Sequence, residues 1–173
     1  MLSGTEFELW CTQVGLSAEA VAVVNQIRTS EPVRSVVGNG GNVTGRYPSQ
    51  KMGRTIQFES HTCELPFILL CEFPEMDDVI EYWDQPYKLP VTYKNKKGQT
   101  VRTHLVPDFF LLRKGAAEFV ECKTEEKLIR LAKEQPNKYC LDADGNWRCP
   151  PGEEAAAKFG INFRVISTTA IRA

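Results

Sequence analysis

Apolar residues recur at helical spacing near the start of the chain. In residues 16–28, the positions that fall on one stripe of a helix are Ala20, Val24 and Ile27. Ser17 precedes them, and a serine hydroxyl at this place accepts a hydrogen bond from a first-turn N–H. The pattern therefore predicts a helix with one buried face and with Ser17 as its N-cap.

The next stretch, residues 29–57, has no regular hydrophobic period. Gly, Ser, Pro and Asn are frequent there, which is typical of an irregular connection. We expect residues 1–45 to form an N-terminal helix and a flexible arm. The main domain is then predicted to span residues 46–173.

Beyond this arm, alternating apolar and polar residues indicate strands, and helical spacing returns between them. Two turn sequences, at residues 95–98 and 113–115, connect neighbouring strands. The predicted elements are a helix capped by Thr62 with Glu64 in its first turn, strands at 87–93, 99–106, 108–112 and 118–123, a helix at 125–134 capped by Thr124, a helix at 151–159 and a strand at 161–167. This order predicts an α/β fold with a central mixed β-sheet flanked by helices.

Length and charge narrow the class of protein. The chain has 173 residues and a formal net charge of −1. One main domain can bury its own core at this length, and a charge so near zero gives no general attraction to nucleic acid. Because no apolar run approaches the roughly 20 residues that cross a bilayer and no signal-peptide pattern is present, we expect a soluble, cytoplasmic protein.

The six cysteines form no CxxC pair. Cys140 and Cys149 flank one short segment, which leaves a zinc site as an alternative, but no histidine stands at zinc-finger spacing. Free, partly buried thiols are therefore the prediction.

Charges within the irregular arm have one sign. No acidic residue occurs between Glu31 and Glu59, and the basic residues there are Arg34, Arg46, Lys51 and Arg54. Such a segment suits contact with DNA phosphates, although an ordinary solvated loop has the same composition. Both interpretations stay open, with Arg46, Lys51 and Arg54 as candidate DNA-binding residues.

Glu121 and Lys123 are two positions apart in a predicted strand, so their side chains project from the same face. An acid and a lysine within an apolar strand each need a partner, because unpaired buried charge is costly. They satisfy this need by pairing with each other. A structural ion pair is therefore the alternative to a catalytic role.

Asp108 brings a second acid to the same point. It begins a strand that the turn at residues 113–115 places antiparallel to the strand of Glu121 and Lys123. Two acids and a lysine suit phosphodiester hydrolysis: the carboxylates hold Mg²⁺, which polarises the phosphate and activates water, and the lysine positions or deprotonates that water. Histidine or thiol ligands would instead favour zinc.

With Glu64 on a preceding helix, this order of elements matches the core of PD-(D/E)xK nucleases. Over about residues 46–168, the chain resembles the TnsA family, the endonuclease subunit of Tn-seven-like heteromeric transposases. The blocks that carry the resemblance are Arg46-Tyr-Pro-Ser-Gln-Lys-Met-Gly-Arg54, Phe58-Glu-Ser60, Glu64, Asp84-Gln-Pro86, Pro107-Asp-Phe-Phe110, Glu121-Cys-Lys-Thr124 and Gly160-Ile-Asn-Phe-Arg-Val165.

The resemblance implies a restriction-endonuclease-like fold and a Mg²⁺-dependent endonuclease, with Mn²⁺ able to substitute. It implies cutting of the 5′, non-transferred strands at the ends of a transposon, alongside a DDE transposase of the TnsB type and an AAA+ regulator of the TnsC type, in the bacterial cytoplasm and on the nucleoid when acting. By position, Glu64, Asp108 and Glu121 would bind metal and Lys123 would be the catalytic lysine. Glu59 is a second candidate for the helix position, and some family members have glutamine in place of Glu121.

Three questions stay open. Separate-subunit members carry a carboxy-terminal winged-helix region, whereas this chain ends soon after its last predicted strand, so we expect a shortened chain or the nuclease part of a TnsA–TnsB fusion. A stand-alone restriction-like or junction-resolving nuclease would have the same fold. A non-catalytic DNA-binding assembly module would be expected to lack an acid or the lysine, and all four site residues are present.

Overall fold

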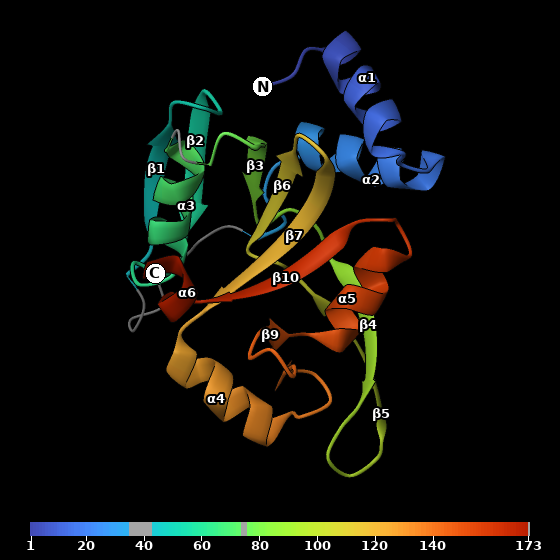
Figure 1. The fold of residues 1–173 in the computed structure, drawn as a ribbon, viewed down its shortest axis with the longest axis vertical. Coiled ribbons are helices and arrows are strands. Elements are labelled where there is room, and N and C mark those ends of the chain that lie inside the picture. The colour runs from blue at the N-terminus through green and yellow to red at the C-terminus, as the bar shows by residue number, and fades with distance from the viewer. Residues whose placement is uncertain (35–42, 74–75, 173) are drawn as a thin grey trace.

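A four-stranded mixed sheet, in the order β10-β7-β6-β3, forms the centre of the protein (Figure 1). β10 (Asn162–Ser167) runs parallel to β7 (Ala116–Lys123). β6 (Phe109–Arg113) is antiparallel to both β7 and β3 (Val79–Asp84). The predicted α/β class with a central mixed sheet is therefore confirmed.

The structure is a computed structural model that describes residues 1–34, 43–73 and 76–172. Within these residues the helices are α1 (Gly4–Val14), α2 (Ala18–Thr29), α3 (Glu64–Glu72), α4 (Glu125–Glu134), α5 (Pro150–Ala157) and α6 (Thr168–Arg172). Three antiparallel hairpins lie outside the central sheet: β1 (Gly45–Ser49) with β2 (Arg54–Phe58), β4 (Leu89–Lys94) with β5 (Thr100–Leu105), and β8 (Cys140–Leu141) with β9 (Trp147–Arg148).

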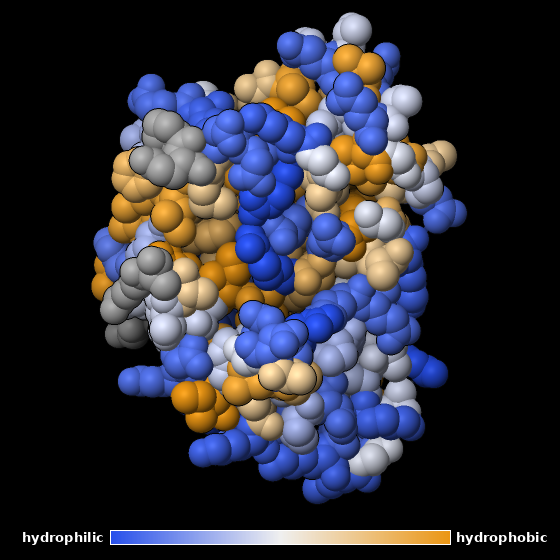
Figure 2. Space-filling model, viewed as in Figure 1, coloured by the Kyte–Doolittle hydropathy of each residue, from blue (hydrophilic) through white to orange (hydrophobic). Residues whose placement is uncertain are grey.

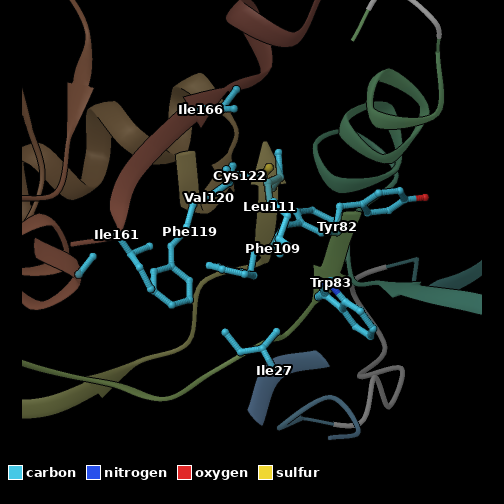
Figure 3. Packing of buried hydrophobic residues seen from close by; sticks show 14 of the residues in the cluster. Ile27, Tyr82, Trp83, Phe109, Leu111, Phe119, Val120, Cys122, Ile161 and Ile166 are labelled. Atoms are coloured by element: carbon cyan, nitrogen blue, oxygen red, sulfur yellow. The ribbon is translucent and has the colours of Figure 1, made fainter. Parts of the chain in front are cut away.

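The core lies on the faces of the sheet and is rich in aromatic side chains (Figure 3). Phe110 and Phe119 of paired strands have ring centroids 5.0 Å apart, and Phe67 of α3 lies 5.1 Å from Phe109. All four are fully or almost fully buried. Phe109 packs β6 against α3, while Phe110 and Phe119 are buried on the opposite face of β6 and β7.

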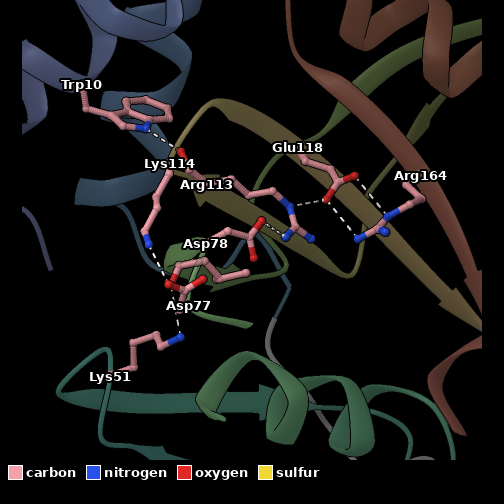
Figure 4. Close-up of polar contacts among 9 residues, drawn as sticks. Trp10, Lys51, Asp77, Asp78, Arg113, Lys114, Glu118 and Arg164 are labelled. Atoms are coloured by element: carbon pink, nitrogen blue, oxygen red, sulfur yellow. Dashed lines mark hydrogen bonds and ion pairs between the residues drawn. The ribbon is translucent and has the colours of Figure 1, made fainter. Parts of the chain in front are cut away.

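α1 and α2 lie at the end of the sheet where β6 turns into β7, and α4 lies at the opposite end (Figure 1). At the first end, the Trp10 indole N–H donates to the backbone oxygen of Arg113 at 2.7 Å. Arg113 in turn contacts Asp78 at 2.6 Å and Glu118 at 2.9 Å (Figure 4). This polar network joins the N-terminal helices to the sheet, far from the strand ends that hold the candidate site.

Several predicted elements are confirmed with their capping residues. Ser17 accepts from the N–H of Ala20 at the start of α2, and Thr124 accepts from the N–H of Lys127 at the start of α4. Gly160 follows α5 in the left-handed conformation, with φ of 66°, which glycine adopts without strain. The six cysteines are free thiols, as predicted.

The prediction of an irregular arm was wrong for its second half, because β1 and β2 form a hairpin there. Burial alternates along β1, but its residues Gly-Arg-Tyr-Pro-Ser do not alternate between apolar and polar, so the sequence carries no strand pattern there. The middle of the predicted arm, residues 35–42, lies outside the described residues. α1 was not predicted, although the Ser3 and Glu6 side chains form a capping box at its start.

Thr62 does not cap the helix of Glu64. α3 begins after Cys63, and no side chain forms a cap hydrogen bond there, while the hydroxyl of Ser60 accepts from the N–H of Cys63. β3 was also missed, because it is buried almost continuously and contains the buried acid Glu81, so its apolar residues do not alternate.

Candidate active site

The ends of β6 and β7 bring Asp108, Glu121 and Lys123 together. Because Phe109 pairs with Val120, the next position of the antiparallel register places Asp108 beside Glu121. The Asp108 carboxylate accepts a hydrogen bond from the backbone N–H of Cys122 at 2.8 Å. The backbone of β7 thus holds Asp108 directly beside the strand that presents Glu121 and Lys123.

Glu121 is buried and receives two donors on one oxygen. Its Oε1 forms an ion pair with Lys123 Nζ and accepts from the hydroxyl of Tyr139 at 2.9 Å. Its Oε2 is buried and has no hydrogen-bond partner. A buried carboxylate oxygen without a partner is costly, and a cation or a donor from a bound molecule would satisfy it.

Glu64 begins α3, where the positive end of the helix dipole favours a carboxylate. Its Oε2 accepts from the backbone N–H of Glu59 at 2.8 Å. Glu59, the second candidate for the helix position, therefore contributes this backbone contact to Glu64.

The two acids Glu64 and Asp108 interact, and both have raised pKa values. Burial raises the pKa of Glu64 to about 8, and the negative charge of Asp108 adds to the shift. Burial raises the pKa of Asp108 to about 6, against the opposing effect of the Lys123 charge. Burial alone would lower the pKa of Lys123, but the charges of Glu121 and Asp108 outweigh it and raise that pKa. A bound cation would therefore displace protons from the acids.

A hollow of about 340 Å³ opens over these residues. Asp108, Glu121, Lys123 and Tyr139 line it, while Glu64 is not among its lining residues. Most of the charged side chains around its wall are basic: Arg34, Lys127 and Lys138. An anionic group such as a phosphate would meet both the acids and a surrounding ring of positive charge.

Comparison with known protein families identifies the family to which this chain belongs. A family model described as "TnsA-like endonuclease N terminal" matches residues 76–168, which is more than half of the 173 residues. The chain belongs to this TnsA-like family. No curated protein matches the chain significantly. The matched range contains Asp108, Glu121 and Lys123, together with the whole central sheet.

Glu64 and the β1–β2 hairpin precede the part that matches the TnsA-like family. The three candidate DNA-binding residues lie on this hairpin or its turn, and none of them lines the hollow. Arg46 is exposed, Lys51 Nζ donates to the backbone oxygen of Val79 at 3.1 Å, and Arg54 lies 4.9 Å above the Trp83 ring. Lys51 and Arg54 thus have contacts that also support the fold.

The oxygen ligands of the site fit a hard cation such as Mg²⁺, and the partnerless Oε2 of Glu121 supports this fit. Among the described residues, however, no three acidic, histidine or cysteine side chains already surround one point closely enough to hold a metal ion. Glu121 faces Lys123 and Tyr139, and Glu64 faces the backbone of Glu59. A metal site with three such ligands is therefore not already formed by the described side chains.

Sequence reasoning missed Tyr139 and Arg34 as residues of this candidate site. Tyr139 follows α4 and is 18 positions from Glu121 along the chain. Arg34 reaches the hollow because its Nε donates to the side-chain oxygen of Gln85 at 2.9 Å, and the N–H of Gln85 donates to the backbone oxygen of Asp108. The signal for Gln85 was the Asp84-Gln-Pro86 block, whereas no local pattern indicated Tyr139.

Within the described residues, no helix is long and apolar enough to cross a membrane.

Proposed function

We propose that this chain is a metal-dependent DNA endonuclease with a PD-(D/E)xK fold. It cuts the 5′, non-transferred strands at transposon ends together with a DDE transposase of the TnsB type, under an AAA+ regulator of the TnsC type. The observation that carries the proposal is the meeting of Asp108, Glu121 and Lys123 in one hollow, inside the part that matches the TnsA-like endonuclease family.

Asp108, Glu121 and Glu64 would hold the metal, Mg²⁺ or Mn²⁺, through their carboxylates. When bound, the metal supplies a Lewis acid for the phosphate and lowers the pKa of a water molecule. Burial of the site strengthens each of these charge interactions, because the local dielectric is low. The charges of Glu64 and Asp108 interact, which supports including Glu64 in the ligand set.

Lys123 has the position of the catalytic lysine. Its side chain is largely buried and lines the hollow, and its raised pKa keeps it protonated at neutral pH. An ammonium group there donates to a phosphate oxygen or orients the attacking water, while Arg34 and Lys127 receive the neighbouring phosphates. The structural alternative is that Lys123 only neutralises Glu121, and the ion pair between them is present.

Cleavage of a labelled transposon-end duplex, with the partner transposase and Mg²⁺, separates these roles. In Lys123→Met, cutting of the 5′ strand should fall by about 10²–10⁴-fold, the usual contribution of a positioned acid–base group. Cutting of the 3′ strand by the partner should continue.

Lys114→Gln is the matched control, because Lys114 is exposed at the far end of β6 and also pairs with an acid, Asp77. Its 5′ cutting should equal that of the native chain. If Lys123→Met also cuts at the native rate while it stays folded, the lysine is structural and the non-catalytic assembly module becomes the better description.

A further inference from the structure

The β4–β5 hairpin concentrates positive charge next to the candidate site. Between Asp84 and Asp108 the chain has no acidic residue, although its formal net charge is −1. The basic residues of this stretch, besides His104, are Lys88, Lys94, Lys96, Lys97 and Arg102, and all five are exposed. The molecule as a whole has no net positive charge, but this stretch has a local excess of positive charge.

These five cations have no acidic partner among the described residues. Elsewhere about half of the cations are paired: Arg113, Lys114 and Arg148, for example, each contact an acid within 4 Å. On the hairpin, Lys94 Nζ donates only to the hydroxyl of Thr100, at 2.6 Å. Like charges that are gathered without counter-charges repel one another, so folding alone gives no reason for the cluster.

The register of the hairpin puts Lys94, Arg102 and His104 on one face, and Lys96 and Lys97 lie in the turn at its tip. Thr92 pairs with Arg102 and Lys94 pairs with Thr100, and these side chains are exposed. The opposite face is anchored in the core by buried Leu89, Val91 and Leu105. The polar face is therefore held in a fixed orientation by the packing of the other face.

This face leads into the candidate active site. His104 pairs with Pro90 on the same exposed face and also lines the hollow of Asp108 and Lys123. In Figure 1 the hairpin extends away from the sheet below α5, at the end of the molecule where α4 also lies, and Figure 2 shows mostly hydrophilic residues over this end of the molecule. Lys127 and Lys138 stand around the same hollow. Basic residues thus continue from the hollow to the tip of the hairpin.

The dimensions suit a double helix. Six residues of each strand span about 20 Å, which equals about 6 base pairs of duplex. We infer that the β4–β5 hairpin is the arm that binds the DNA duplex flanking the scissile phosphate, through phosphate contacts of Lys94, Lys97 and Arg102. This inference rests on the proposed function, and it assigns DNA binding to a surface different from the β1–β2 hairpin.

Salt-dependent binding of a duplex tests the inference. The probe is a labelled random-sequence duplex of about 30 base pairs, which exceeds the span of the hairpin, titrated without divalent metal so that it is not cut. In the variant K94Q/K97Q/R102Q, the slope of log affinity against log salt concentration should fall in magnitude by about 3, since each lost phosphate contact removes about 0.9.

A matched pair of single variants removes the effect of net charge. Arg102→Gln and Lys114→Gln each remove one exposed positive charge, but only Arg102 lies on the hairpin face. Arg102→Gln should lower the slope by about 1, and Lys114→Gln should leave it unchanged. Unchanged thermal unfolding of all variants shows that the fold is intact.

The inference is overturned if the triple variant keeps the native slope, or if the native chain fails to bind the duplex at low salt. If the triple variant keeps the native salt slope for the duplex but no longer binds an acidic protein partner, the hairpin is the binding surface for that partner instead. Failure here is distinct from failure of the proposed function, which is judged by 5′ cutting in Lys123→Met. Duplex binding and strand cutting are separate measurements, and either can fail alone.

Discussion

Glu121 illustrates how single contacts set the chemistry of the candidate site. Lys123 and Tyr139 both engage Oε1, and Oε2 remains buried without a partner. Two donors on one oxygen fix the rotation of the carboxylate and leave the other oxygen available for a cation. We therefore regard Tyr139 as a positioning residue for Glu121, the proposed metal ligand, since hydrogen bonds to a ligating side chain orient it in this way.

Tyr139→Phe removes the hydroxyl that donates to Glu121 and keeps the buried ring. We expect binding of Mn²⁺ to weaken by about 10–100-fold, the usual effect of losing a hydrogen bond that orients a metal ligand. Electron paramagnetic resonance of free Mn²⁺ measures this affinity without any cleavage reaction.

Tyr93→Phe is the control, because both tyrosine rings lie near Lys138 Nζ, at 5.7 Å and 5.4 Å from Tyr93 and Tyr139 respectively. Equal Mn²⁺ affinity in the two variants would show that the Tyr139 hydroxyl has no role in holding the ligand.

At the scale of elements, α4 is the helix that closes one side of the hollow. Lys127, Leu131 and Gln135, at or just after the helix, line it at successive turns. The helix begins at Glu125 with Thr124 as its N-cap, immediately after Lys123, so its first turn and Lys123 share one short stretch of backbone. The cap of α4 therefore supports both the helix and the end of β7.

Thr124→Ala removes the hydroxyl that accepts from the N–H of Lys127 at 3.2 Å. The free energy of unfolding should fall by about 1 kcal/mol, the usual cost of losing an N-cap. Urea unfolding followed by circular dichroism measures this change.

Thr12→Ala is the comparison, because the Thr12 hydroxyl bonds only to the backbone oxygen of Glu8 inside α1. Alanine is the better helix former at that exposed place, so stability should not decrease. Losses of equal size in both variants would contradict a capping role for Thr124.

For the whole molecule, Glu81 joins the N-terminal helices to the central sheet. This fully buried acid of β3 accepts from the backbone N–H of Leu2, from Arg28 of α2 and from the indole of Trp83. The Arg28 guanidinium donates to both of its oxygens, each at 2.9 Å. α1 and α2 contribute to the same buried core as the sheet, so their docking and the burial of Glu81 depend on each other.

Arg28→Met leaves Glu81 buried without its cationic partner. We expect the free energy of unfolding to fall by about 3–5 kcal/mol, since removing one member of a buried pair exposes the desolvation cost of the other. Chemical denaturation measures the loss.

Adding Glu81→Gln to Arg28→Met should restore part of this stability, because the neutral amide removes the cost of an unpaired buried charge. Its oxygen still accepts from the N–H of Leu2 or of Trp83, whereas its NH2 group faces the other donor, so the recovery is incomplete. A single variant as stable as the native chain would mean that α1 and α2 are not tied to the sheet through this pair.

The sequence by itself determined the features that depend on neighbouring residues. Alternation placed Glu121 and Lys123 on one face of β7, and the turn at residues 113–115 made β6 its antiparallel neighbour, which brought Asp108 to the same point. Local hydrogen bonds of Ser17 and Thr124 likewise marked the starts of α2 and α4. These features are local because a strand period, a tight turn or a cap involves only a few consecutive residues.

Only the tertiary structure decided which distant segments meet. It inserted β3 beside β6, separated the β4–β5 hairpin from the central sheet, and brought Arg34 and Tyr139 to the hollow. It also turned Glu121 toward Tyr139 and left Oε2 without a partner. Contacts between residues far apart in the chain depend on the packing of the whole core, and a local sequence pattern does not encode that packing.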